Sequence, residues 1–523
     1  MEIELMACYN WFYLKRAKDA KNMLTYQEQA KEFTNNYSAV IDEAVINLSK
    51  TFDTLFYEKN SSLILPTIET AISMLSKSYN IPTKMQICYN IANGHHDFRT
   101  IEKTDSELHL EKEIYYLRTT LDMYENNFPD DDDSIDNIES KVAKYIAMRS
   151  YTNLGNAFRA LNRYIAAIDC FHNALLISNG FAMASLNLSF LLFHYAQLQI
   201  RPYEQRYYHH ACFYYYEQTK NHKVNLESQD YLDALENCIS AFTASYIDGY
   251  LSKPLDLPPF HVPDQAEFDY RNYLLMFRLF LDPCLDILSE PCFAVDSIHL
   301  PFNYPLSEQE KEFVGLFNQI KQEYNLARYL WYKVSTDDTY EHYADKELDL
   351  IDTGDLANYS LQESLMRIAF KTAYSLFDRI GFFINEYFQV GLTEAKISFK
   401  NVWKEKLCDG NGQVYFIVPN PIIRTHLSNP LIQAMFWLQK DFFEDKKISV
   451  TAPHAERIFQ MRNDMEHNCL RTGKQSYDVT FTKYTSDEKI EDNTYRLLRL
   501  ARELIIYLCL AVGFDRKKNR DTF

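Results

Sequence analysis

Apolar residues recur at intervals of three and four along most of this chain, the spacing of an amphipathic helix. The segment Gln27–Phe56 shows it first, with apolar positions including Phe33, Val40 and Leu48. The same spacing predicts further helices over residues 63–75, 110–124, 182–196, 203–215, 231–250, 308–334, 361–389, 431–443, 455–468 and 494–512. Only 12 Gly occur in 523 residues, fewer than turn-rich β folds need. The pattern therefore predicts an all-α protein.

One part of this pattern repeats. Small and large apolar residues follow the tetratricopeptide (TPR) consensus at Tyr151, Leu154, Gly155, Phe158, Ala167, Phe171 and Ala174. The small Gly155 and Ala167 allow two helices to approach closely, while Phe158 and Phe171 fill the groove between them. Residues 182–196 continue the pattern in register, and a more degenerate unit opens at Tyr89. We expect two to four TPR-like helical pairs, with an unrelated helical hairpin as the alternative.

Proline-rich stretches mark the division of the chain. They are residues 254–259 and 301–305, and Pro82 marks an earlier break. Ser307 followed by Glu310 has the spacing of a capping box, which starts a helix. We predict an N-terminal helical region (1–81), TPR-like repeats (82–200), an aromatic-rich helical connector (201–306) and a four-helix C-terminal domain (307–523).

The C-terminal domain carries a β-prone insertion between its second and third helices. The insertion spans residues 396–418, with a turn at 409–412 and a β-prone segment at 413–418. A second small strand is predicted at 477–481.

Composition limits the class of protein. No apolar run of about 18 residues occurs, and the N-terminus lacks the basic start of a signal peptide. The ten Cys include no C-x-x-C, so we expect buried thiols in the cytoplasm. The net charge of −18 argues against nonspecific RNA coating. A local basic site remains compatible with this charge. The candidates for it are Arg496, Arg499, Arg502 and the tail 516–520. The alternative is that these residues form a solvated helix face and a frayed terminus.

The stretch from Arg462 to His467 carries the strongest candidate chemistry. An arginine, a polar Asn463 and a histidine five residues after the arginine lie on one predicted helix. Arginine is permanently cationic and its planar fork matches phosphate oxygens. Histidine exchanges protons near neutral pH. The alternative is an Arg462–Glu466 surface pair with a histidine at a helix end.

Together with its flanking segments, this motif resembles the HEPN (higher eukaryotes and prokaryotes nucleotide-binding) superfamily. The resemblance covers roughly residues 310–515, with segments 397–403 and 436–441 preceding the motif in the family's order. It implies a homodimer and metal-independent cleavage of RNA. The catalytic candidates are Arg462, Asn463, Glu466 and His467, with Glu466 holding Arg462 or a histidine of the partner chain.

The resemblance thus implies an endoribonuclease of antiviral defence or toxin-like growth arrest, with the TPR-like region expected to sense or dock a partner. The alternatives are a noncatalytic TPR/HEPN scaffold that binds protein partners or nucleotides, and a toxin held by an antitoxin. We expect no cofactor, metal or membrane. The pairs His95–His96 and His209–His210 are adjacent in sequence, which suits metal ligation poorly, and His454 is expected to cap the motif helix.

Overall fold

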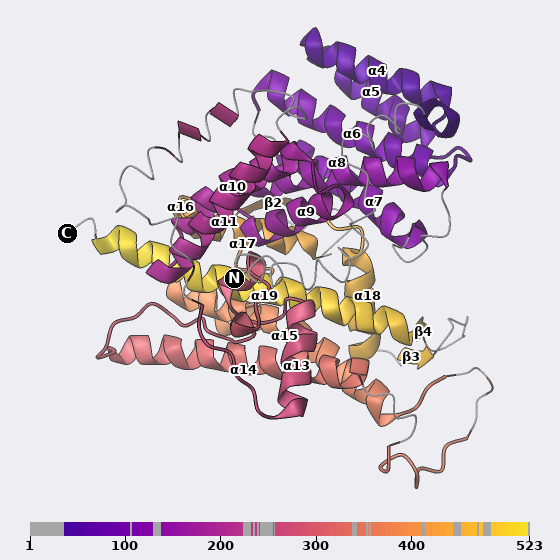
Figure 1. The fold of residues 1–523 in the computed structure, drawn as a ribbon. Helices are drawn as coiled ribbons and strands as arrows, with labels where there is room; N and C mark the ends of the chain where they lie inside the picture. The colour runs from indigo at the N-terminus through magenta and orange to yellow at the C-terminus, as the bar shows by residue number, and fades with distance from the viewer. Residues whose placement is uncertain are drawn as a thin grey trace. The chain divides into compact units, whose positions relative to one another are not determined.

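The computed structural model describes residues 36–104, 107–128, 137–222, 232–233, 236–237, 240, 255, 257–336, 342–351, 354, 357–408, 414–419, 421–442, 451–467, 470–473 and 483–520. The chain forms two compact units. The first comprises residues 1–256 with 445–453, and the second comprises 257–444 with 454–523. The all-α prediction is confirmed, since helices dominate both units (Figure 1).

The first unit consists of helices that pack in consecutive pairs. They are α4 (Glu43–Tyr57), α5 (Ser61–Met74), α6 (Ile81–Glu102), α7 (Glu107–Asn127), α8 (Ile138–Ala160), α9 (Tyr164–Ile177), α10 (Ala182–Ala196) and α11 (Pro202–Asn221). Each pair also contacts the next, as α6 packs against α8 and α9 against α10. This is the arrangement of stacked helical hairpins. The predicted helix at 231–250 lies largely outside the described residues.

Local capping sets where these helices begin. The side chain of Asp42 accepts a hydrogen bond from the Ala44 amide, so α4 begins at Glu43 and the expected continuous helix from Gln27 is wrong at this point. Pro82 lies in the first turn of α6, where a missing N–H costs nothing, and Asn80 caps that helix. The break expected at Pro82 is therefore a helix start.

Gly155 of α8 leaves room for the Phe171 ring of α9. A Cβ atom placed on it would lie 2.7 Å from the Phe171 ring, too close for any side chain. The other residues of the repeat pattern are all buried: Tyr151, Leu154, Phe158, Ala167, Phe171 and Ala174. The small residues thus permit a close helix–helix contact, although membership of these hairpins in the TPR class stays a prediction.

The second unit is built on long helices that pack side by side. They are α14 (Glu308–Thr336), α15 (Leu361–Tyr387) and α19 (Asp487–Arg520), with α17 (Pro430–Leu438) against α19 and α18 (Ala455–His467) against α15. The predicted capping box is present, since Ser307 and Glu310 exchange hydrogen bonds. All four predicted main helices are found. The fourth extends beyond the predicted residues 494–512 at both ends, because the added turns are mostly polar and carry a weak apolar signal.

Shorter elements complete this unit: α13 (Gln265–Met276), η3 (Pro283–Asp286), η4 (Pro291–Phe293), η5 (Glu394–Lys396), α16 (Pro421–His426) and η6 (Gln439–Asp441). The insertion contains an antiparallel pair, β1 (Lys404–Cys408) and β2 (Val414–Pro419). The β-prone prediction is confirmed by β2, while β1 was not predicted. A parallel pair, β3 (Leu470–Gly473) and β4 (Lys483–Ser486), follows the motif helix. The predicted strand at 477–481 lies outside the described residues.

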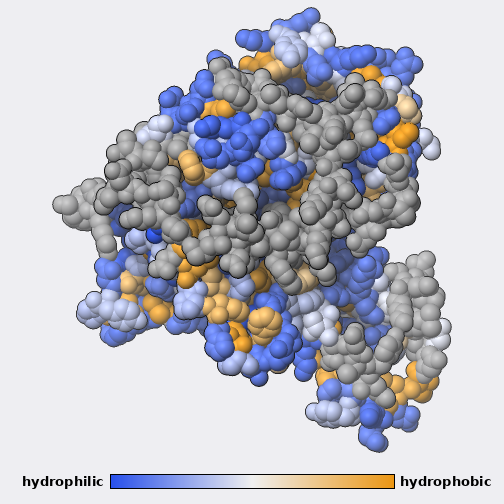
Figure 2. Space-filling model, viewed as in Figure 1, coloured by the Kyte–Doolittle hydropathy of each residue, from blue (hydrophilic) through white to orange (hydrophobic). Residues whose placement is uncertain are grey.

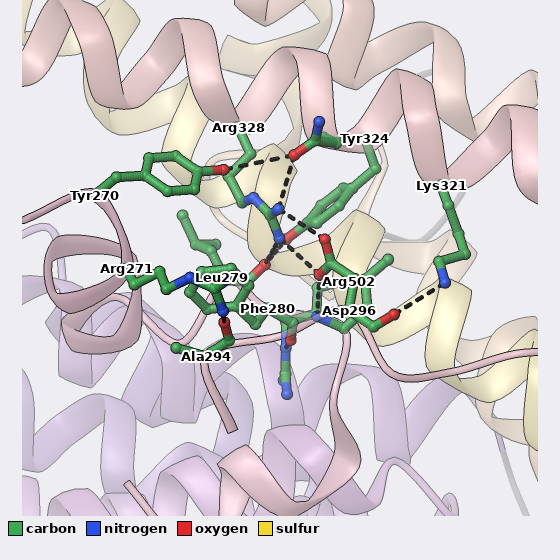
Figure 3. Close-up of polar contacts among 12 residues, drawn as sticks. Tyr270, Arg271, Leu279, Phe280, Ala294, Asp296, Lys321, Tyr324, Arg328 and Arg502 are labelled. Atoms are coloured by element: carbon green, nitrogen blue, oxygen red, sulfur yellow. Dashed lines mark hydrogen bonds and ion pairs between the residues drawn. The ribbon is translucent and has the colours of Figure 1, made fainter. Parts of the chain in front are cut away.

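The unit begins at Leu257, so residues 257–306 pack with the C-terminal helices. Arg328 of α14 is one anchor for them. Its guanidinium donates to both Asp296 carboxylate oxygens, at 2.8 and 2.7 Å, and to the Leu279 carbonyl (Figure 3). Lys321 donates to the carbonyls of Asp296 and Ile298. Burial pushes the pKa of Asp296 up, but the hydrogen bonds and charge of Arg328 outweigh this and hold it below its usual value.

Arg502 of α19 is the second anchor. It is 1% exposed and donates to the Phe280 carbonyl at 2.6 Å, the Asp282 carbonyl at 2.9 Å and the Asp286 carboxylate at 2.7 Å. Arg499 donates to the carbonyls of residues 277 and 278. These two members of the basic cluster are therefore structural. The sequence suggested that Arg499 and Arg502 form either a solvated helix face or a local basic site. Their contacts with residues 277–286 correspond to neither.

On the face drawn in Figure 2, hydrophilic residues of the described segments predominate and apolar residues form smaller separate areas. Within the described residues, no helix combines the length and hydropathy that a membrane span requires.

Candidate functional site

Helix α18 packs one apolar side against the rest of the second unit. Ile458 and Met461 are buried at 5% and 6% exposure, and Met465 is partly buried. The Asn493 amide approaches the Met461 sulfur at 3.9 Å. At its start, the His454 carbonyl accepts a hydrogen bond from the Ile458 amide, so this residue contributes to helix initiation through its backbone. The apolar side fixes the rotation of α18 and leaves its polar residues on the remaining surface.

Arg462 lies partly buried on this polar surface. One guanidinium nitrogen donates to the Asn463 side-chain oxygen at 3.0 Å. The guanidinium carbon lies 5.8 Å from the centre of the Tyr374 ring, which is within the range of a cation–π contact. An arginine side chain has five N–H donors. Among the described residues, only Asn463 receives a hydrogen bond from Arg462, so most of its donors face no protein acceptor.

Asn463 therefore contacts Arg462 in this structure. A role for Asn463 in orienting His467 or a phosphate stays a prediction, beside its observed hydrogen bond to the Arg462 guanidinium.

Glu466 has a different partner from the one expected. Its carboxylate oxygen lies 3.6 Å from the Lys371 ammonium of α15, and the two side chains are 39% and 41% exposed. The expected Arg462–Glu466 pair within the helix is not formed. The reason is tertiary, since α15 packs against α18 and brings a second cation to the carboxylate.

His467 is the last residue of α18. Its side chain lies outside the described part of the structure. By helix geometry, five residues separate Arg462 and His467 by about 7.5 Å along the axis and about 140° around it. The backbone thus places both on the last two turns of one helix but on different sides of it.

Helix α15 contributes a stripe of polar residues that the sequence reading missed. Arg367, Lys371 and Tyr374 are spaced at i, i+4 and i+7, so they share one face of the helix. Each reaches a different part of the motif region. Arg367 donates to the Leu470 carbonyl at 2.5 Å, Lys371 faces Glu466, and Tyr374 lies against Arg462.

Arg367 fixes the chain just after the motif helix. Besides its bond to Leu470, it pairs with Glu363 one turn earlier on α15. The Asn358 amide donates to the Thr472 carbonyl at 2.6 Å, so strand β3 is held at two points. The sequence already showed that α15 is a helix. The spacing of Arg367, Lys371 and Tyr374 along it was a signal from which these residues could have been added to the candidate site.

The other histidine candidates are structural. His95 is buried on α6, its Nδ1 lies 2.9 Å from that of His109, and burial lowers its pKa to about 3. His96 bonds to Glu113. Burial lowers the pKa of His209 to about 4. Within the part of the chain that the structure describes, no group of three His, Cys, Asp or Glu residues is arranged to hold a metal ion.

Comparison with known families places a match in the C-terminal part of the chain. Residues 305–515 match the family model described as LA2681-like HEPN, so the C-terminal region of this chain is a HEPN domain. The match includes α14, α15, α18 and most of α19, and with them the whole candidate site. Searches of curated proteins and of solved structures gave no match.

Proposed function

From the LA2681-like HEPN domain at residues 305–515, we propose that this protein is an endoribonuclease that cleaves RNA without a metal ion. The observation that carries the proposal is the state of Arg462. It is held by Asn463 and Tyr374 while most of its donors face no described protein acceptor. A phosphate is the group that such an arginine fork suits best.

The proposed reaction uses the RNA's own 2′-hydroxyl as nucleophile. A neutral His467 removes the hydroxyl proton, and the oxygen attacks the adjacent phosphorus. The bond from phosphorus to the 5′-oxygen breaks, and that oxygen takes a proton from a protonated imidazole. The products are a 2′,3′-cyclic phosphate and a 5′-hydroxyl. Arg462 stabilises the charge that builds up on the phosphoryl oxygens.

The two proton transfers favour a site shared between two copies of the chain. One helix spreads Arg462 and His467 by about 140°, which prevents them from stacking on the same side of one phosphate. A twofold axis along the last turns of α18 would bring an arginine and a histidine from each copy around one cleft. We therefore propose that the active form is a homodimer through the HEPN domain.

The proposed biological role rests on the HEPN domain and on the helical hairpins of the first unit. We propose RNA cleavage in antiviral defence or toxin-like growth arrest, with the helical hairpins of the first unit sensing or docking a partner. The stacked hairpins also favour the second candidate, a noncatalytic scaffold. Extended surfaces made of helical pairs serve protein binding in many architectures.

The decisive experiment incubates the purified full chain with total RNA in the presence of EDTA. Cleavage that persists under chelation and leaves 2′,3′-cyclic ends supports the nuclease. Intact RNA at every protein concentration and in the presence of cell extract supports the scaffold instead. Arg462→Ala serves as the matched control for a contaminating nuclease.

A further inference from the structure

The pair formed by Lys371 and Glu466 has the features of a binding group rather than a structural one. Their charged atoms lie 3.6 Å apart, beyond ordinary hydrogen-bond length, and both side chains are about two-fifths exposed. Among the described residues, the Lys371 ammonium makes no shorter polar contact. An ammonium has three donors, and one whose nearest partner among the described residues is a carboxylate at 3.6 Å can donate to another anion.

Its position ties this lysine to Arg462. Lys371 and Tyr374 are neighbours at i and i+3 on α15, and the Arg462 guanidinium lies over the Tyr374 ring. From the other side, Glu466 and Arg462 are i+4 neighbours on α18. Each cation therefore contacts the helix that carries the other: Arg462 of α18 lies against Tyr374 of α15, and Lys371 of α15 faces Glu466 of α18.

We propose that Lys371 is a second phosphate-binding residue of the candidate RNA site and that Glu466 is the residue that positions it. The inference rests on the proposed nuclease function and adds to it. A single-stranded RNA presents a phosphate at each nucleotide, so one phosphate meets Arg462 while its neighbour meets Lys371. As the phosphate arrives, the ammonium exchanges the carboxylate at 3.6 Å for a phosphoryl oxygen. Glu466 is then a positioning residue and takes no part in proton transfer.

The test measures binding of a short 2′-O-methyl oligoribonucleotide by the full chain as the salt concentration is raised. The methyl group blocks the nucleophile, so binding is observed without cleavage. Each single-strand phosphate contact contributes about 0.7 to the slope of log K against log salt. Lys371→Met is expected to lower the slope by about 0.7 and to weaken binding at low salt by about tenfold or more. Lys371→Arg should keep the slope of the natural protein.

Lys311→Met is the matched control, because Lys311 also pairs with a glutamate on the surface of the second unit but lies on α14. It should leave the slope unchanged. Glu466→Gln should retain the slope and bind at least as tightly, and RNA cleavage by this variant should fall by less than about tenfold, below the loss typical of a missing proton-transfer group.

Three results separate the possible failures. Equal slopes for Lys371→Met and Lys311→Met, with weakened binding by Arg462→Ala, overturn the role of Lys371 while the nuclease proposal stands. A loss of cleavage by about a hundredfold or more in Glu466→Gln makes Glu466 a proton-transfer residue and overturns its positioning role. A natural protein that neither binds the oligonucleotide nor cuts RNA overturns both proposals together.

Discussion

Two groups of charged residues in the second unit use the same chemistry in opposite ways. Arg502 and Asp286 are 1% and 0% exposed, and the guanidinium also donates to two backbone carbonyls. Lys371 and Glu466 are two-fifths exposed and lie 3.6 Å apart. The buried cation has its donors engaged by the protein, whereas the exposed one does not. The comparison indicates that the number of N–H donors already hydrogen-bonded to the protein, more than the charge, distinguishes a structural cation from one that can bind a ligand.

Removing the buried cation should have the largest effect on stability. Arg502→Met leaves Asp286 buried without its partner, and breaking one side of a buried pair costs about 3–5 kcal/mol. We expect a large fall in the urea midpoint of the second unit. The double variant Arg502→Met/Asp286→Asn should recover part of the loss, because no unpaired charge remains buried. An unchanged midpoint in the single variant would show that the pair is solvated in solution.

Removing Arg462, the partly buried cation of the motif, should act on chemistry rather than on folding. Arg462→Ala is expected to lower the rate of RNA cleavage by about 10²- to 10³-fold, the effect of losing one transition-state donor. His467→Ala should abolish cleavage as well. The free energy of unfolding of both variants should stay within about 0.5 kcal/mol of that of the natural protein, because neither change removes an apolar residue of the core.

The same two variants test the shared site. An Arg462→Ala chain mixed with a His467→Ala chain should regain some activity, because a mixed dimer contains one composite site with both natural residues. The activity of the mixture is compared with each variant alone at equal total concentration. Full activity in a species that light scattering shows to be strictly monomeric would contradict the dimer.

A third change addresses the first unit, where packing rather than charge is at issue. Gly155→Leu must displace the Phe171 ring, since even a Cβ would lie 2.7 Å from it. Overpacking of this kind costs roughly 1–3 kcal/mol, so the melting temperature of the full chain should fall. Gly315 on α14 has no atom within 4 Å of its would-be Cβ, and Gly315→Leu is the control that should be tolerated. RNA cleavage below the melting temperature should be unaffected in both.

The smallest effect is expected for the stability contribution of the exposed pair. Lys371→Met should change the free energy of unfolding by less than about 1 kcal/mol, because exposed ion pairs are screened by solvent. Thermal unfolding at low and high salt measures this. A loss as large as that of Arg502→Met would mean that Lys371 is a structural cation and would remove the contrast between the two groups.

The sequence by itself determined the helical class, the position of the motif on a helix and the capping box that starts α14. Each of these depends on residues within a few turns of one another, so local spacing was enough. The same holds for Gly155, because the small residue and the Phe171 ring belong to one hairpin.

Only the tertiary structure decided which residues surround the motif. Lys371 and Tyr374 reach Glu466 and Arg462 because α15 packs on α18, and no spacing along the chain encodes that contact. The tertiary structure also decided that Arg502 is buried. An arginine on an amphipathic helix looks solvated in sequence, and it becomes structural only when a distant segment supplies a carboxylate and carbonyls for its donors.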